Sequence, residues 1–130
     1  MSREAPTQLR TRAGFDPRKG RSLLAAEPIR QGELIEAAPV VVFSCDDARL
    51  IDQTPLFDYY FRWQGDIQAG GSGAIALGFV SLCNHAFEPS ATVRPNYDDS
   101  TLELYAAIDI AAGEEITICY CSLWFEPAPS

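Results

Sequence analysis

The sequence has few histidine and cysteine residues, no long apolar run and no secretory signal. Its 130 residues include one lysine, Lys19, one histidine, His85, and four cysteines. No run of 18 apolar residues occurs, so we expect no membrane span and no membrane partner. The first residues lack the apolar core of a secretory signal. We therefore expect a cytoplasmic protein, or a nuclear one if the source is eukaryotic or viral.

The four cysteines give little support to a metal site. Cys119 and Cys121 are two positions apart, so on a strand they would face the same side. Four ligands with the spacing of a zinc site cannot be named. In an intracellular protein such cysteines are more often buried thiols than bridges. We expect no metal.

The charge is unevenly distributed along the chain. The formal net charge is −8, yet residues 1–21 hold six basic and two acidic residues, so the remainder carries −12. An acidic body disfavours nucleic-acid binding, which depends on neutralising phosphates. It favours a basic peptide or a cationic cofactor as partner. Solubility alone would also explain the surplus carboxylates.

Length and composition predict one domain with a modest core, since 47% of the residues are hydrophobic. Residues 1–13 are polar, basic and without periodicity, and we expect them to form a flexible basic arm. Residues 14–125 are expected to form the single domain, and 126–130 to fray.

Strand-like composition or alternation marks six segments. They are residues 22–26, 34–43, 59–63, 91–97, 102–108 and 115–120. Residues 44–51 predict a short helix with Ser44 as its N-cap. Residues 66–73 hold three glycines and predict a loop. Residues 55–63 also fit helical spacing.

Residues 25–35 and residues 106–116 are similar in sequence and form an internal repeat, called the internal echo below. Each copy reads as a strand, an isoleucine anchor, a turn closed by Gly-Glu, and a further strand. The glycines, Gly32 and Gly113, occupy the same place, which predicts a turn position with positive φ. Two copies fit a pair of similar β-corners in one all-β core better than a solenoid.

Two motifs hold the residues best suited to chemistry. Asn84 and His85 follow an apolar segment, and about thirty residues later Gly113-Glu-Glu-Ile-Thr-Ile-Cys ends on Tyr120. A histidine beside apolar residues is more often a satisfied core group, although it could act as a general base. No nucleophile with a family signature accompanies it, which disfavours a cysteine–histidine hydrolase.

These motifs resemble those of the SET-domain protein-lysine N-methyltransferases, Asn-His-x-x-x-Pro-Asn and Gly-Glu-Glu-φ-Thr-φ-x-Tyr, where φ is apolar. Residues 19–26 are similar to the opening Gly-x-Gly loop and strand of that family, and the resemblance spans roughly 14–120. It implies a mainly β SET-domain, or β-clip, fold of small twisted sheets with short helices and a C-terminal pseudo-knot. The single SET domain would be a minimal one over residues 14–125.

The resemblance also implies an activity and a set of site residues. The activity is methyl transfer from S-adenosylmethionine to the ε-amine of lysine in a basic protein substrate, with Tyr120 as catalytic residue. The methyl donor would be held by Gly20, Arg21, Ser22, Leu82, Asn84, His85 and Tyr120. Because aromatic faces favour sulfonium and methylated ammonium groups, candidates for the substrate channel are Tyr59, Tyr60, Phe79 and Tyr105.

The chain departs from the family pattern at three positions. Ser22 replaces the second glycine of Gly-x-Gly, Ser90 replaces the asparagine after the proline, and Cys119 stands where an acidic residue is common. The alternative function is a catalytically weak SET or β-clip binding module. Without a zinc site, Trp124 and Phe125 would close the pocket. A short chain of this kind could form a homodimer to complete its cleft.

Overall fold

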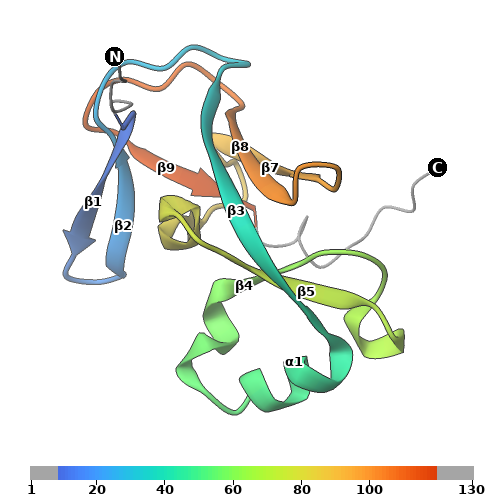
Figure 1. Cartoon of the computed structure of the whole chain (residues 1–130). Coiled ribbons are helices and arrows are strands. Elements are labelled where there is room, and N and C mark those ends of the chain that lie inside the picture. The colour runs from blue at the N-terminus through green and yellow to red at the C-terminus, as the bar shows by residue number, and fades with distance from the viewer. Residues whose placement is uncertain (1–8, 120–130) are drawn as a thin grey trace, which may run out of the picture.

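Short strands in two sheets are the main regular structure of the described part of the chain, residues 9–119, in the computed structural model (Figure 1). The first sheet has the order β1 (Thr11–Asp16), β2 (Gly20–Ala25), β9 (Glu115–Ile118) and β6 (Asn84–His85). The second has the order β4 (Tyr60–Arg62), β5 (Ser72–Ala76), β3 (Leu34–Ser44), β8 (Thr101–Ala106) and β7 (Ala91–Asn96). The helices are α1 (Cys45–Ile51) and the 3-10 helices η1 (Pro55–Tyr59), η2 (Ile67–Ala69) and η3 (Phe79–Leu82). The expected mainly β fold with short helices is confirmed.

Strand β3 lies at the centre of the second sheet and joins the β4–β5 part of it to the β7–β8 part. Residue 34 and residues 36–39 pair with β8, and residues 40–44 pair with β5 (Figure 1). The change of partner falls at Pro39, which has no amide hydrogen to donate but whose carbonyl accepts from Leu77 (2.7 Å). Ser44 then caps α1 by accepting from the Asp47 amide, as the sequence predicts.

The two β-corners of the internal echo are present and bind each other. Ile29 and Ile110 exchange both backbone hydrogen bonds at 2.8 Å, and both side chains are buried. Gly32 and Gly113 each have a φ of 88°, in the left-handed region that favours glycine. Each glycine amide donates to the strand that enters the opposite corner. The predicted positive φ is therefore confirmed at both glycines.

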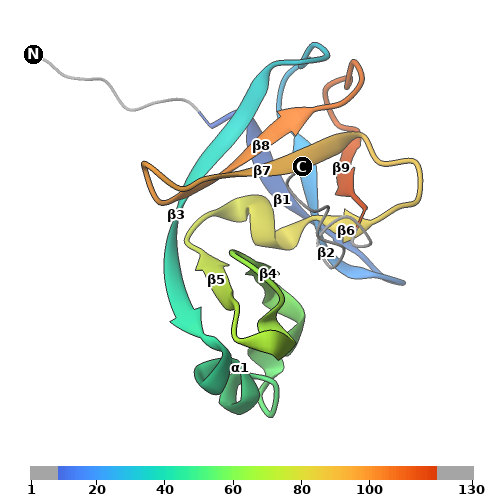
Figure 2. The same ribbon diagram turned by 90° about the vertical axis from the view of Figure 1, so that its right-hand side faces the viewer.

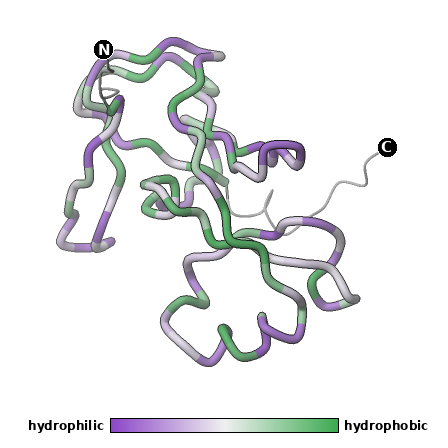
Figure 3. Tube along the Cα trace, in the orientation of Figure 1, coloured by the Kyte–Doolittle hydropathy of each residue, from purple (hydrophilic) through white to green (hydrophobic). Residues whose placement is uncertain are grey.

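The hydrophobic core is shared by both sheets. Leu102, Leu104 and Ala106 alternate with less buried residues along β8, as the sequence pattern predicts. Ile116 and Ile118 do the same on β9. Figure 3 shows apolar chain through the middle of β3, while the β1–β2 and β7–β8 turns are polar. Helix η3 lies between the two sheets and leads directly into β6 (Figure 2).

Three strands were not predicted: β1, β5 and the two-residue β6. Strand β1 starts at Thr11, inside the segment 1–13 that we assigned to a flexible arm, and it pairs with β2 along its whole length. Its mostly exposed side chains leave no alternation to detect. Strand β5 includes the end of the glycine-rich segment. Glycine is needed at position 73 of this strand because a Cβ there would collide with the Phe43 ring. The ambiguous residues 55–63 divide into η1 and β4.

The pseudo-knot and the membrane span can be considered only for the described residues. A pseudo-knot would involve residues after Cys119, which lie outside the described part. Between residues 9 and 119, no helix combines the length and apolar character that crossing a membrane requires.

Candidate functional site

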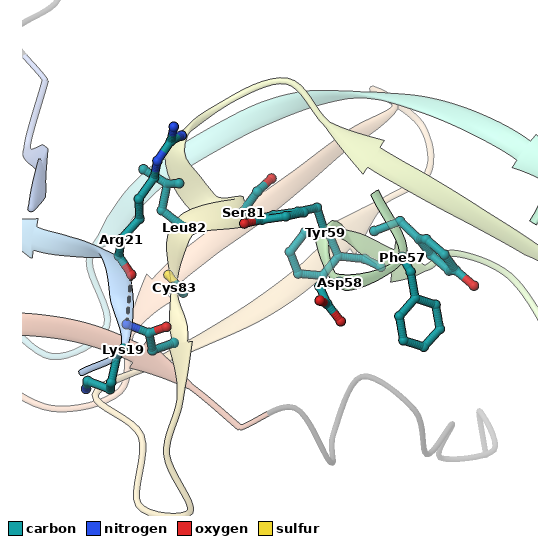
Figure 4. A pocket seen from close by; sticks show the side chains of 11 residues that line it. Lys19, Arg21, Phe57, Asp58, Tyr59, Ser81, Leu82 and Cys83 are labelled. Atoms are coloured by element: carbon teal, nitrogen blue, oxygen red, sulfur yellow. Dashed lines mark hydrogen bonds between the residues drawn. The ribbon is translucent and has the colours of Figure 1, made fainter. Parts of the chain in front are cut away.

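A cleft of about 490 Å³ opens between β2, the η3–β6 segment and the η1–β4 segment. Figure 4 shows Arg21, Leu82 and Cys83 on one side of it and Phe57, Asp58 and Tyr59 on the other. The complete lining is Lys19, Arg21, Phe57, Asp58, Tyr59, Tyr60, Phe61, Ser81, Leu82, Cys83 and Asn84. The structure thus gathers five of the predicted site residues: Arg21, Leu82, Asn84, Tyr59 and Tyr60.

Gly20 shapes this cleft through its backbone. Its φ of 84° lies in the left-handed region, and no atom lies within 4 Å of where a Cβ would stand. Glycine is therefore favoured here by conformation rather than by space. The turn places its neighbours Lys19 and Arg21 in the lining of the cleft.

Asn84 joins three distant parts of the chain. The two residues of β6 pair in parallel with Thr117 and Ile118 of β9, which brings the two predicted motifs side by side. The Asn84 amide nitrogen donates to the Arg21 carbonyl (3.1 Å, dashed in Figure 4) and to Glu115 Oε2 (2.8 Å). With both amide hydrogens engaged, its carbonyl oxygen is the polar atom that can accept from a ligand.

Glu115 is a site residue that our sequence analysis missed. Besides accepting from Asn84, it accepts from Lys19 Nζ at 2.7 Å. One carboxylate thereby links the β1–β2 turn, β9 and β6. The ion pair is partly exposed and contributes little stability by itself, so its main effect is to orient Asn84. The Gly-Glu-Glu motif was the available signal.

Two side chains of the cleft have pKa values moved by their surroundings. Burial, and then a hydrogen bond from its hydroxyl to Asp52 (2.7 Å), raises the pKa of Tyr60 to about 12. Burial also raises the pKa of the Cys83 thiol, and the carboxylates of Glu36 and Glu115 add to this. Cys83 is 2% exposed. A protonated, buried thiol is a poor nucleophile, which argues against a cysteine–histidine hydrolase.

Known proteins are similar to this chain in sequence and in architecture. The SET domain family model matches residues 20–121. A histone-lysine N-methyltransferase of Schizosaccharomyces pombe, specific for H3 lysine 37, is 33% identical over 115 residues, which are 87% of this chain and 75% of that protein. This chain belongs to the SET-domain family.

Solved structures agree with this SET-domain assignment. A Plasmodium falciparum protein assigned as a histone methyltransferase superposes with a TM-score of 0.68 at 25% identity, over 92% of this chain and all of that one. The Chaetomium thermophilum Polycomb Repressive Complex 2 bound to S-adenosylmethionine gives 0.72 at 20% identity. There the match covers 92% of this chain and 16% of the much longer chain, and it shows the fold alone.

Ser90 anchors the segment after His85 in this SET domain. Its hydroxyl accepts from the Thr117 amide (3.0 Å) and donates to the Glu115 carbonyl (3.3 Å). Its own amide donates to Thr117 Oγ1 (3.1 Å). These bonds hold the segment after His85 against β9. The serine therefore anchors this part of the motif, at the position where the family motif has an asparagine.

Ser22 is buried, 4% exposed, rather than open to the cleft. It pairs with Gly14 on β1, and a Cβ at Gly14 would lie 3.0 Å from the Ser22 hydroxyl. The extra atoms of the serine occupy space that Gly14 leaves free. Ser22 borders a separate hollow with Phe15 and Leu24, so our prediction of Ser22 as part of the donor site concerns at most its backbone.

Three other predicted residues do not line the cleft. The His85 ring packs edge-to-face on Phe87, with centroids 4.5 Å apart. Phe79 begins η3 and directs its amide to Glu36. Tyr105 donates its hydroxyl to Glu103 on its own strand (2.7 Å), which raises its pKa, and its ring lies under the Arg94 guanidinium. Residue type alone could not separate these aromatic residues from Tyr59 and Tyr60.

The end of the second motif is outside the described part of the chain. Tyr120, predicted as catalytic and donor-binding, lies there, as do Cys121, Trp124 and Phe125. Cys119 is disulfide-bonded, contrary to the expectation of free thiols. Between residues 9 and 119, no three His, Cys, Asp or Glu side chains gather as metal ligands would.

Proposed function

We propose that this SET-domain protein transfers a methyl group from S-adenosylmethionine to the ε-amine of a lysine in a basic protein. Its family and its fission-yeast relative support lysine methylation in general. The observation that carries the proposal is that Arg21 and Asn84 line one cleft, and that the Asn84 amide binds both the Arg21 carbonyl and Glu115. These residues come from the three motifs on which the resemblance rests.

The residues present fit this donor. A cleft of about 490 Å³ is within the usual size of small-molecule sites. Arg21 would attract the carboxylate of the donor, and the Asn84 carbonyl oxygen would accept from its ammonium group. The aromatic faces of Phe57 and Tyr59 suit the positive sulfonium. When bound, S-adenosylmethionine supplies an electrophilic methyl group.

The chain's own contribution to the reaction would be alignment and exclusion of water. The amine nitrogen forms a bond to the methyl carbon as the carbon–sulfur bond breaks, and the amine proton passes to solvent. Such an in-line displacement needs a neutral amine held at the right distance more than it needs acid–base chemistry. The predicted role of the Tyr120 hydroxyl is to hold the reacting groups in line.

The substrate would be basic. The sequence from residue 22 onward carries a net charge of −12, and one of its carboxylates, Asp58, lines the cleft itself. Complementary charge raises encounter rates and is screened by salt. Turnover of a basic peptide should therefore fall as salt is added.

Calorimetry with S-adenosylmethionine, followed by a methyl-transfer assay on lysine peptides, tests the proposal. We expect binding, a raised melting temperature, and transfer whose rate increases with pH toward the lysine pKa. Lys19 is the only lysine, so mass spectrometry distinguishes methylated enzyme from methylated peptide. No binding at millimolar donor refutes the enzyme. Donor binding without transfer to any basic lysine peptide supports the alternative, a weak binding module.

A further inference from the structure

Glu36 is a carboxylate on the core side of strand β3. The pairing of β3 with β8 shifts register between Leu34 and Glu36, which leaves Ile35 as an extra residue. As a result Glu36 stands opposite Leu104, which is fully buried. A bulge of this kind redirects a side chain, and bulges often occur next to active sites.

The Glu36 carboxylate caps η3 from a neighbouring strand. Its Oε2 accepts from the Phe79 amide at 2.9 Å. Gly78 is at the N-cap of η3 and has no side chain that could cap the helix. The first amides of a helix need an acceptor, and Glu36 supplies one from 43 positions away.

Gly78 and Glu36 fit only as a pair. A Cβ at position 78 would collide with Glu36 Oε2 and lie 3.0 Å from the Ala38 Cβ. The φ of Gly78 is −171°, an extended value open to any residue. A side chain at position 78 would therefore have to displace the Glu36 carboxylate.

The second carboxylate oxygen is buried as well. Glu36 Oε1 has no hydrogen-bond partner among the described residues. Burying a carboxylate oxygen in this way opposes folding, so a carboxylate at this place serves something other than stability. The charge also reaches Cys83, whose thiol pKa it helps to raise. Glu36 thus acts on both ends of the segment that leads to Asn84.

We propose that Glu36 is a positioning residue for the donor cleft. It fixes the start of η3, and η3 in turn sets Ser81, Leu82 and Asn84 along the cleft wall. This inference rests on the proposed function, because it assigns Glu36 to donor binding.

The test compares Glu36→Ala and Glu36→Gln by calorimetry with S-adenosylmethionine. Loss of a hydrogen bond to a charged group should raise the donor Kd of Glu36→Ala by about tenfold or more. Glu36→Gln keeps an oxygen for the Phe79 amide and should stay within about threefold of the parent. Hydrogen–deuterium exchange gives a readout without donor: residues 79–84 should exchange faster in Glu36→Ala only. Glu103→Ala on the adjacent strand β8 is the matched control, with unchanged donor Kd.

Gly78→Ala provides an independent route to the same contact. It should displace the carboxylate and raise the donor Kd as Glu36→Ala does, whereas in the Glu36→Ala background it should add little. That non-additivity tests the pair directly and remains available if one variant fails to fold.

If the parent binds donor and folded Glu36→Ala binds it equally well, the positioning role is wrong while the proposed function stands. A lowered melting temperature with unchanged Kd and unchanged exchange at residues 79–84 refutes it in the same way. If the parent itself binds no donor, the proposed function fails and this inference fails with it.

Discussion

Replacing Asn84 by alanine should raise the Kd for the methyl donor. The Asn84 amide makes one hydrogen bond to a neutral carbonyl and one to the Glu115 carboxylate. Such bonds contribute about 1 kcal/mol and about 1.5–3 kcal/mol. Strand β6 is only two residues long, so these bonds are a large part of what holds it. If half to all of this free energy reaches the donor site, the Kd should increase by about 10- to 1,000-fold.

Asn96→Ala is a closely matched control. The Asn96 amide also donates to two groups, Asp99 (3.3 Å) and the Glu103 carboxylate (3.0 Å), but it lies at the end of β7, away from the cleft. Both variants should lose comparable stability in urea denaturation, and only Asn84→Ala should lose donor affinity in calorimetry. Equal donor Kd values for the two variants would refute the assignment of Asn84 to the donor site.

Four further predictions concern catalysis, fold, pH and metal. Tyr120→Phe should keep donor affinity and slow methyl transfer, measured in single turnovers at saturating donor; an unchanged rate means that Tyr120 has another role. Gly113→Ala, at a φ of 88°, should lower the free energy of unfolding by about 1–2 kcal/mol in urea titrations, and no loss would contradict the strain argument. Because the pKa of Tyr60 is raised from 10.0 to about 12, its contribution to stability is present at neutral pH and is lost as pH rises from about 10 through 12; Tyr60→Phe should remove this alkaline step from the melting curve. Chelators should leave melting temperature and activity unchanged, whereas loss of structure together with release of stoichiometric zinc would show a metal site.

Sequence patterns predicted those strands that have one buried face. Leu102 and Leu104 on β8 alternate with polar residues because only one side of that strand meets the core. Strand β1 escaped prediction because its partner β2, and not its own pattern, creates it. In β5 the small residues Gly73 and Ala74 pack under larger neighbours, and composition alone reads them as a loop.

The candidate site was predictable where a motif carried it. Arg21, Leu82 and Asn84 were found because the family motifs mark them, and the structure brings them together. Glu36 and Glu115 were missed because their partners are 43 and 31 positions away, and no local pattern reports such contacts. The channel aromatics were only partly right, since an aromatic residue fills a core and lines a cleft equally well.

The reciprocal β-corners determine the order in which this chain can fold. Ile29 and Ile110 are 81 positions apart, yet each supplies the hydrogen bonds that complete the other. Contacts over such separations form late, because the entropy of closing a long loop opposes them before they contribute any energy. The β1–β2 and β7–β8 hairpins can form locally, but neither corner can close by itself. A nascent chain on the ribosome therefore has an open first corner until Gly113 and its strand have emerged, and its apolar faces stay accessible to chaperones until then.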